Sequence, residues 1–181
     1  MSYCKFTKDL DENHLDRQYH DKRYGFPVEE DDELFGRLIL EINQAGLSWS
    51  LMLKREENFY KAFANFSIQK VAQFDEHDIE ELLKDAGIIR NRKKIEAVIY
   101  NARQILTLQK EFGSFKNWID KHNGLSLEEW TKLFKKNFKF TGPLIVEEFL
   151  MSTSYLKPAH EKDCEVFNEI LKKKPRWQEN I

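Results

Sequence analysis

Apolar residues recur every three or four positions along most of the chain, which is the spacing of one face of an α-helix. Within 31–46, for example, Leu34, Leu38, Ile42 and Ala45 fall on one stripe. No stretch has the strict apolar–polar alternation of a half-buried strand, and no internal repeat is evident. The pattern predicts helices over 31–46, 48–63, 67–74, 75–87, 91–113, 114–122, 126–137 and 142–153.

Residues that can cap or start a helix stand at these boundaries. They are Asp31 or Asp32, Ser48, Asp75 with Asp78, Ser126 with Glu129, and Pro143. Glycines that can end a helix stand at 46, 87 and 113. We therefore expect an all-α fold, with residues 1–181 forming a single domain.

Composition agrees with a soluble globular protein, because 41% of the 181 residues are hydrophobic and 33% are charged. Charges interrupt every apolar run, so we expect no membrane span. The first residues, MSYCKFTKDLDEN, lack the apolar core of a signal peptide, which favours the cytoplasm. The net charge of −2 neither supports nor excludes nucleic acid, and no glycine-rich phosphate motif predicts a nucleotide cofactor.

The segment GIIRN, at 87–91, joins two predicted helices through very few residues. Gly87 permits a left-handed backbone there, and the next helix begins near Asn91 with its first N–H groups free. A helix start beside a tight hairpin can bind a phosphate, and basic residues add positive charge. These are Arg90, Arg92, Lys93 and Lys94. The alternative is a solvated basic turn between two core helices.

Glu41 falls on or beside the apolar stripe of its predicted helix, where a carboxylate loses hydration. It is either a core glutamate satisfied by neighbouring donors or the acceptor at the floor of a pocket. After it come Gly46 and Leu47 at a turn, and then Trp49. Leu47 could wedge between bases and Trp49 could stack on one. Plain core packing is the alternative for both residues.

Several of these residues belong to an ordered set of motifs. The set comprises Cys4, YHD at 19–21 with Gly25 and Pro27, QAGLSW at 44–49, DAGIIRNRKKI at 85–95, FKF at 138–140, and His160 with Cys164. Through them the chain resembles the 3-methyladenine DNA glycosylase I family, the constitutive alkylpurine glycosylases of bacteria. The resemblance runs over nearly the whole chain. It implies a helix-hairpin-helix fold, with that element at about 78–111, and hydrolysis of the N-glycosidic bond of flipped 3-methyladenine in double-stranded DNA.

The resemblance also implies roles for individual residues. Glu41 would recognise the adenine edge and act as the catalytic carboxylate. The pocket would be lined by Phe6, Tyr19, Tyr24 and Trp49, with Trp49 stacking on the base. The DNA contacts would come from Gly46, Leu47, Gly87, Ile88, Ile89, Arg90, Asn91, Arg92 and Lys93. The protein would act as a monomer, without a membrane and without a nucleotide cofactor.

The two cysteines lie near opposite ends of the chain, each with a histidine in the same region. From the residues alone, His160 and Cys164 are an ordinary surface pair, and a Cys4–Cys164 disulfide is an alternative that a reducing cytoplasm disfavours. The resemblance instead implies one structural Zn²⁺ bound by Cys4, His20, His160 and Cys164. That site would join residues 1–25 to residues 155–181.

The chain also departs from the family pattern. Phe6 and Tyr24 stand where the family usually has tryptophan, which would reshape the pocket wall. Glu147 and Glu148 stand in a block that normally reads Tyr-Ser-Phe-Met-Gln and bring acid into that region. Two further functions therefore remain open: a glycosylase for another alkylpurine, and a reader of alkylated DNA that does not cleave it.

Overall fold

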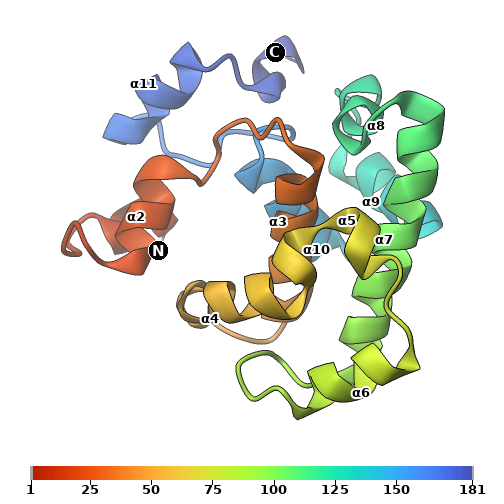
Figure 1. Ribbon diagram of the computed structural model, residues 1–181. Helices are drawn as coiled ribbons and strands as arrows, with labels where there is room; N and C mark the ends of the chain where they lie inside the picture. The colour runs from red at the N-terminus through yellow and green to blue at the C-terminus, as the bar shows by residue number, and fades with distance from the viewer. Residues whose placement is uncertain (1, 181) are drawn as a thin grey trace.

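The computed structural model describes residues 2–180, and over that range the chain forms helices and no strands (Figure 1). The predicted all-α class is therefore confirmed. The elements in chain order are α1 (Tyr3–Thr7), α2 (Leu15–Lys22), α3 (Asp31–Gln44), α4 (Trp49–Ala62), η1 (Ala64–Phe66), α5 (Ile68–Val71), α6 (Glu76–Lys84), α7 (Arg92–Phe112), α8 (Phe115–Lys121), α9 (Leu127–Asn137), α10 (Pro143–Ser152), α11 (Glu165–Lys172) and η2 (Arg176–Asn180).

The main hydrophobic core lies among α3 to α10, which we call the helical body. Helix α3 is buried along most of its length, α10 packs against α3 and α9, and the long α7 packs against α5 and α8. The largest fully buried side chains include Trp130, Phe35 and Phe149. Burying a large apolar side chain contributes about 1.5–3 kcal/mol, so this core is a main source of stability for the helical body.

Most of the predicted caps are present. Ser48 accepts a hydrogen bond from the Leu51 N–H, and Ser126 and Glu129 form a complete capping box. Asp75 and Asp78 do the same at the start of α6. Each of these caps satisfies donors within its own first turn, which is why the local sequence was sufficient to predict it.

The prediction that Asp31 or Asp32 caps α3 was wrong. Neither side chain caps that helix, whose N-cap residue is Glu30. Asp31 instead accepts hydrogen bonds from the N–H groups of Phe115 and Lys116 at the start of α8, at 2.7 and 2.9 Å. Asp32 accepts one from the N–H of Ile68 at the start of α5, at 3.0 Å. The two carboxylates therefore stabilise the free ends of helices far away in sequence.

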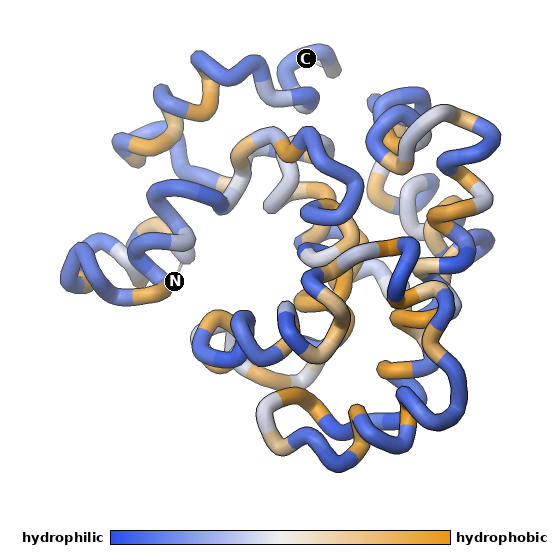
Figure 2. The backbone as a smooth tube through the Cα atoms, in the orientation of Figure 1, coloured by the Kyte–Doolittle hydropathy of each residue, from blue (hydrophilic) through white to orange (hydrophobic). Residues whose placement is uncertain are grey.

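Residues 2–25 and 156–180, which we call the terminal region, lie on the same side of the molecule although they come from opposite ends of the chain (Figure 1). They contain α1, α2 and α11, three helices that the periodicity did not predict. In Figure 2 this region is mostly hydrophilic, whereas hydrophobic positions recur along the central helices. Within residues 2–180, no helix has both the length and the apolar character that a membrane crossing requires.

Candidate functional site

A cavity of about 350 Å³ opens where the terminal region meets the helical body. Its lining residues are Tyr3, Tyr19, Tyr24, Glu41, Gln44, Trp49 and Glu148. The three tyrosines come from the terminal region, and the others come from α3, α4 and α10. Neither region alone makes this cavity.

Aromatic rings form the walls of the cavity. The ring centroids of Tyr19 and Trp49 are 5.1 Å apart, and those of Tyr3 and Tyr24 are 5.2 Å apart. The rings belong to a second, smaller hydrophobic cluster that is separate from the core of the helical body. Flat, electron-rich walls of this kind suit a planar ring, and more so a cationic one.

Glu41 lies on α3 and is only 5% exposed. Its carboxylate has no hydrogen bond or ion pair with any described residue, so the structure does not support a satisfied core glutamate. Burial and the nearby Glu148 carboxylate raise the pKa of Glu41 to about 8, against the opposing effect of Arg37. A buried and unpaired carboxylate at a cavity is suited to accept hydrogen bonds from a ligand.

Tyr19 has its hydroxyl oriented by a buried arginine. The Arg37 Nη1 donates a hydrogen bond to the Tyr19 oxygen at 3.1 Å. Burial raises the pKa of Tyr19 to about 12, so the hydroxyl keeps its proton near neutral pH. Tyr19 is therefore left with one O–H that it can donate into the cavity.

The lining differs from the sequence prediction in four residues. Phe6 does not line the cavity: it is 42% exposed and packs against the outer side of Tyr3, with ring centroids 6.0 Å apart. Tyr3, Gln44 and Glu148 line it although they were not predicted as pocket residues. The position of Tyr3 one residue before Cys4 was the available signal, because α1 turns these two neighbours to different sides.

The turn between α3 and α4 carries Gly46 and Leu47 at the rim. Gly46 has a φ of +85°, and a Cβ built on it would meet no atom within 4 Å, so the turn projects freely. The side chain of Gln44 donates to the carbonyl of Leu47 at 2.7 Å. Lys94, buried at the start of α7, donates to the carbonyls of Asn43 and Ala45. Lys94 thereby joins this turn to the neighbouring hairpin.

The hairpin between α6 and α7 is fixed from outside by α4. Arg55 donates to the carbonyl of Ile88 at 3.1 Å, and Asn58 donates to that of Gly87 at 3.4 Å. The φ of Gly87 is not positive, so the expected left-handed backbone is wrong. Space around it is limited, because a Cβ there would lie 2.9 Å from Asp85 Oδ1 and 3.0 Å from Asn58 Cγ, and these side chains would have to shift.

The basic residues of the hairpin are not equivalent. Helix α7 begins beside Asn91, as predicted, but the Asn91 side chain caps it by accepting a hydrogen bond from the Lys94 N–H, so that donor is not free. Ile88 is buried and Ile89 half-buried, while Arg90 and Lys93 are exposed and have no hydrogen bond or ion pair with any described residue. Arg92 forms ion pairs with three acidic residues, namely Glu76, Glu80 and Glu96. With Lys94 turned inward as well, only Arg90 and Lys93 of the four predicted cations present a free charge.

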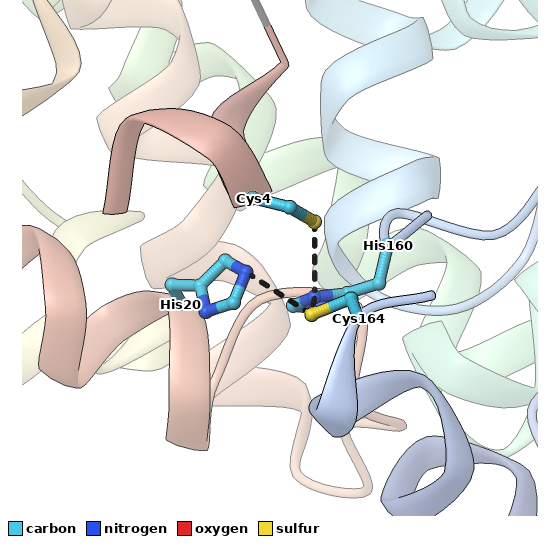
Figure 3. Close-up of side chains that lie close together, drawn as sticks. All are labelled: Cys4, His20, His160 and Cys164. Atoms are coloured by element: carbon cyan, nitrogen blue, oxygen red, sulfur yellow. Dashed lines mark hydrogen bonds between the residues drawn. The ribbon is translucent and has the colours of Figure 1, made fainter. Parts of the chain in front are cut away.

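Cys4, His20, His160 and Cys164 come together in the terminal region (Figure 3). Their ligand atoms all lie within 4.8 Å of one another. The sulfur of Cys164 is 3.5 Å from His160 Nδ1 and 3.7 Å from His20 Nε2, and the sulfur of Cys4 is 3.6 Å from His160 Nδ1. A tetrahedral zinc site with ordinary bond lengths has sulfur–nitrogen edges of about 3.6 Å. These donors therefore fit one tetrahedral metal ion.

The second ring nitrogens of both histidines are also engaged. His20 Nδ1 is 2.6 Å from the Asp21 carboxylate, and His160 Nε2 is 2.8 Å from the Tyr24 carbonyl. Partners of this kind orient histidines that bind metals. Burial lowers the pKa of His160 to about 4, so its ring is neutral and offers a lone pair. Burial raises the pKa of Cys4 to about 11, and a bound divalent cation is what would deprotonate this thiol.

The comparisons with known proteins agree with this geometry. The methyladenine glycosylase family model matches residues 9–130. DNA-3-methyladenine glycosylase 1 of Escherichia coli (strain K12) is 44% identical over 101 residues, which are 56% of this chain and 54% of that protein. DNA-3-methyladenine glycosylase of Haemophilus influenzae is 39% identical over 101 residues, with shares of 56% and 55%. The chain thus spans about half the length of these two relatives.

A solved structure extends the likeness over the whole fold. It is a variant of 3-methyladenine DNA glycosylase I in complex with 3-methyladenine, with a TM-score of 0.80 and 31% identity. The match covers 92% of this chain and 97% of that one. The chain belongs to the methyladenine glycosylase family.

Proposed function

We propose that this protein is a monofunctional DNA glycosylase that removes 3-methyladenine from alkylated double-stranded DNA and leaves an abasic site. The observation that carries the proposal is the unpaired Glu41 carboxylate, buried at an aromatic cavity of about 350 Å³. A cavity of this size can receive one flipped purine. The two relatives and the solved structure carry names with the same activity.

The reaction needs little help from a general acid. A purine methylated at N3 carries a positive charge in DNA, so it leaves as a neutral base when its bond to the sugar breaks. The bond between the sugar carbon and the ring nitrogen gives its electron pair to the base, water adds to the sugar carbon, and one proton is released. The protein therefore has to flip the nucleotide, recognise the cationic base and admit water.

The lining residues have roles that follow from their chemistry. Glu41 accepts hydrogen bonds from the amino edge of the base and favours its positive charge, which neutral adenine lacks. Trp49 and Tyr19 stack against the ring. The Tyr19 hydroxyl, oriented by Arg37, donates a hydrogen bond to a ring acceptor or to water.

The DNA would be bound at two places on the helical body. Leu47, on the projecting turn beside the cavity, enters the gap left by the flipped base. The α6–α7 segment serves as a helix-hairpin-helix element: the N–H groups at the start of α7 that Asn91 does not cap bind a phosphate, with Arg90 and Lys93 supplying charge. Lys94 fixes the distance between these two contacts because it bonds both parts.

The metal cluster would have a structural role. Four protein donors complete a tetrahedral Zn²⁺ site and leave no position for substrate. Tyr3 precedes the ligand Cys4, and the Tyr24 carbonyl contacts the ligand His160, so the cluster positions two walls of the cavity. The structure contains both cysteines as free thiols rather than as a disulfide, which agrees with the reducing cytoplasm that we propose as its location.

Incubation with methylated duplex DNA tests this proposal. Free 3-methyladenine and 7-methylguanine would be measured by chromatography, with native protein beside Glu41→Ala. We expect release of 3-methyladenine by the native protein and its loss in the variant. Release of 7-methylguanine alone would indicate a different alkylpurine substrate. Tight binding of methylated DNA without release of any base would indicate a non-catalytic reader.

A further inference from the structure

We propose that Glu148 is a second specificity-determining carboxylate of the cavity, which together with Glu41 restricts it to purines that carry a positive charge. The inference rests on the proposed function and adds to it a residue of this chain that selects the substrate class. It concerns the acidic block whose departure from the family pattern was noted above.

Glu148 reaches the cavity from α10, whereas Glu41 reaches it from α3. Its neighbour Glu147 does not line the cavity and forms an ion pair with Lys157. Glu148 itself has no ion pair with any described residue. Lys157 pairs with Glu147 and acts on Glu148 only through its charge, while Glu148 accepts a hydrogen bond from the Tyr24 hydroxyl. Glu148 is exposed, so its carboxylate can still contact a ligand in the cavity.

Glu41 provides a second, independent observation that points to a ligand in this cavity. It is more than nine-tenths buried, has no partner, and lines the same cavity as Glu148. Two carboxylates from different helices have thus been placed at one small aromatic space. A metal ion is a poor candidate occupant, because the other lining groups are aromatic rings and one amide.

The two carboxylates influence one another. Repulsion from Glu148 is among the causes that raise the pKa of Glu41, and burial with the charge of Glu147 raises that of Glu148. The other charged or titratable groups that act on the pair are Arg37, Lys157 and Tyr24. A cation bound between the carboxylates relieves the repulsion, whereas a neutral purine does not. The difference favours alkylated purine cations over ordinary purines.

Binding of a fixed cation tests this directly. The probe is 3,9-dimethyladeninium, in which a methyl group replaces the sugar and no cleavable bond to a sugar remains. Neutral 9-methyladenine has nearly the same shape. Their dissociation constants would be measured by calorimetry from pH 6 to pH 9 for the native protein, Glu148→Gln, Glu148→Asp and the matched control Glu128→Gln.

We expect the native protein to prefer the cation, and Glu148→Gln to reduce that preference about tenfold at pH 8.5. In this variant the pH midpoint of cation binding should also move to lower pH, since Glu41 no longer has a charged neighbour. Glu148→Asp should keep most of the preference. Glu128→Gln should change neither quantity, because Glu128 is an exposed residue of α9 that pairs with Lys132 and does not line the cavity. A role of Glu148 in folding alone would not move the pH midpoint.

The same proteins would be assayed for base release from methylated DNA, so that the two proposals can fail separately. If the native protein releases 3-methyladenine but Glu148→Gln keeps both the cation preference and the pH midpoint, Glu148 is not a specificity residue. If the charge preference depends on Glu148 but no base is released, the cavity selects cations and the glycosylase proposal is wrong. Failure of folded native protein to prefer the cation overturns the charge-selection proposal.

Discussion

The helical body and the terminal region are stabilised in different ways. The body buries large apolar side chains such as Phe35, Trp130 and Phe149 in one continuous core. In the terminal region, buried positions are shared between a few apolar side chains and polar ones, among them His20 and His160. The first region can order itself by apolar burial, whereas the second depends on contacts between the two ends of the chain.

The cavity lies where these two regions meet, so its lining depends on both ways of stabilising the fold. Glu41 and Trp49 belong to the region with the large core, and the three tyrosines belong to the region that contains the cluster of Cys4, His20, His160 and Cys164. A loss of order in the terminal region would therefore remove one wall of the cavity and leave the carboxylates in place. The comparison can be tested by weakening each region separately.

Removal of the proposed zinc ion should have the largest effect. With Cys164→Ser or a strong chelator, we expect the amides of α2 and α11 to lose protection from hydrogen exchange while those of α7 keep it. Structural zinc sites supply binding energy on the order of 10 kcal/mol, far more than the few apolar contacts of this region. Hydrogen exchange followed by mass spectrometry would measure the loss helix by helix.

The control for metal removal is His77→Ala, because His77 is an exposed histidine on α6 outside the cluster. It should leave exchange unchanged in all three helices. Elemental analysis of the purified protein should find about one zinc per chain. Equal protection of α2 and α11 with and without chelator would contradict a structural role for the metal.

The second effect concerns the core of the helical body. Phe149 is fully buried on α10 and contacts Phe134, with ring centroids 5.7 Å apart. Phe149→Ala should lower the free energy of unfolding by about 3–5 kcal/mol, because it leaves a cavity in a packed core. Urea unfolding monitored by circular dichroism would measure it.

Phe6→Ala makes the same chemical change at a side chain that is 42% exposed. It should shift the free energy of unfolding by no more than about 0.5 kcal/mol. Similar losses for Phe149→Ala and Phe6→Ala would mean that the two regions share one cooperative core, and the distinction between them would have to be abandoned.

The third effect is a change in pH dependence at the junction of the two regions. The pKa of Glu41 is raised from 4.5 to about 8 in the folded state, so folded protein binds this proton more tightly than unfolded protein does. Protonated Glu41 therefore contributes to the free energy of unfolding. This contribution is fully present below pH 4.5 and is lost as the pH rises through 8. Glu41→Gln should remove this loss and stabilise the protein by roughly 2–4 kcal/mol at pH 8.5.

Urea unfolding at pH 5 and pH 8.5 would measure that gain. The control is Glu57→Gln, since Glu57 is an exposed residue that pairs with Lys61 on α4. Base release by Glu41→Gln should fall about a hundredfold even though the protein becomes more stable. Equal pH dependence of native protein and Glu41→Gln would show that the carboxylate is paired in solution.

The smallest effect is expected at the hairpin, which belongs to the helical body and lies outside the cavity. Arg90→Ala should weaken binding of duplex DNA by about 1 kcal/mol and reduce its salt dependence by about one counterion. Arg92→Ala should have a smaller effect, because Glu76, Glu80 and Glu96 already neutralise that charge.

Fluorescence anisotropy at several salt concentrations would separate these two variants. Neither should alter the preference for a cationic base, since neither residue lines the cavity. A larger loss of DNA affinity for Arg92→Ala than for Arg90→Ala would mean that DNA displaces the three glutamates paired with Arg92. Arg92, rather than Arg90, would then be the cation of the hairpin that binds DNA.

Features that depend on neighbours along the chain could be predicted from the sequence. The capping box of Ser126 and Glu129 satisfies donors within one helical turn, and the stripe of α3 repeats at the helical period. Asp31 shows the limit of such reasoning. Its position predicts a cap for α3, yet its oxygens bind N–H groups more than 80 positions away, a pairing that no local pattern records.

The candidate site shows the same limit. Resemblance to a family named the four donors of the metal cluster, but residues alone left His160 and Cys164 as a surface pair. Glu148 lines the cavity unpredicted, because an exposed glutamate on a helix has no periodic signal. For Tyr3 the only signal was its position next to Cys4. Gly87 was predicted for its backbone freedom, whereas the structure shows a φ that is not positive and close side chains of Asp85 and Asn58.

By itself, the sequence determined the all-helical class, most helix boundaries in 31–152, and the burial of Glu41 on the apolar stripe of its helix. These follow from the helical period and from capping, which act within a few residues. Only the tertiary structure decided which rings surround Glu41, which cations are free, and that a second carboxylate shares the cavity. The lining of the cavity depends on contacts of the terminal region with α3, α4 and α10, and the state of the cations depends on α6, α7 and the turn after α3. The packing of the whole chain is what brings these elements together.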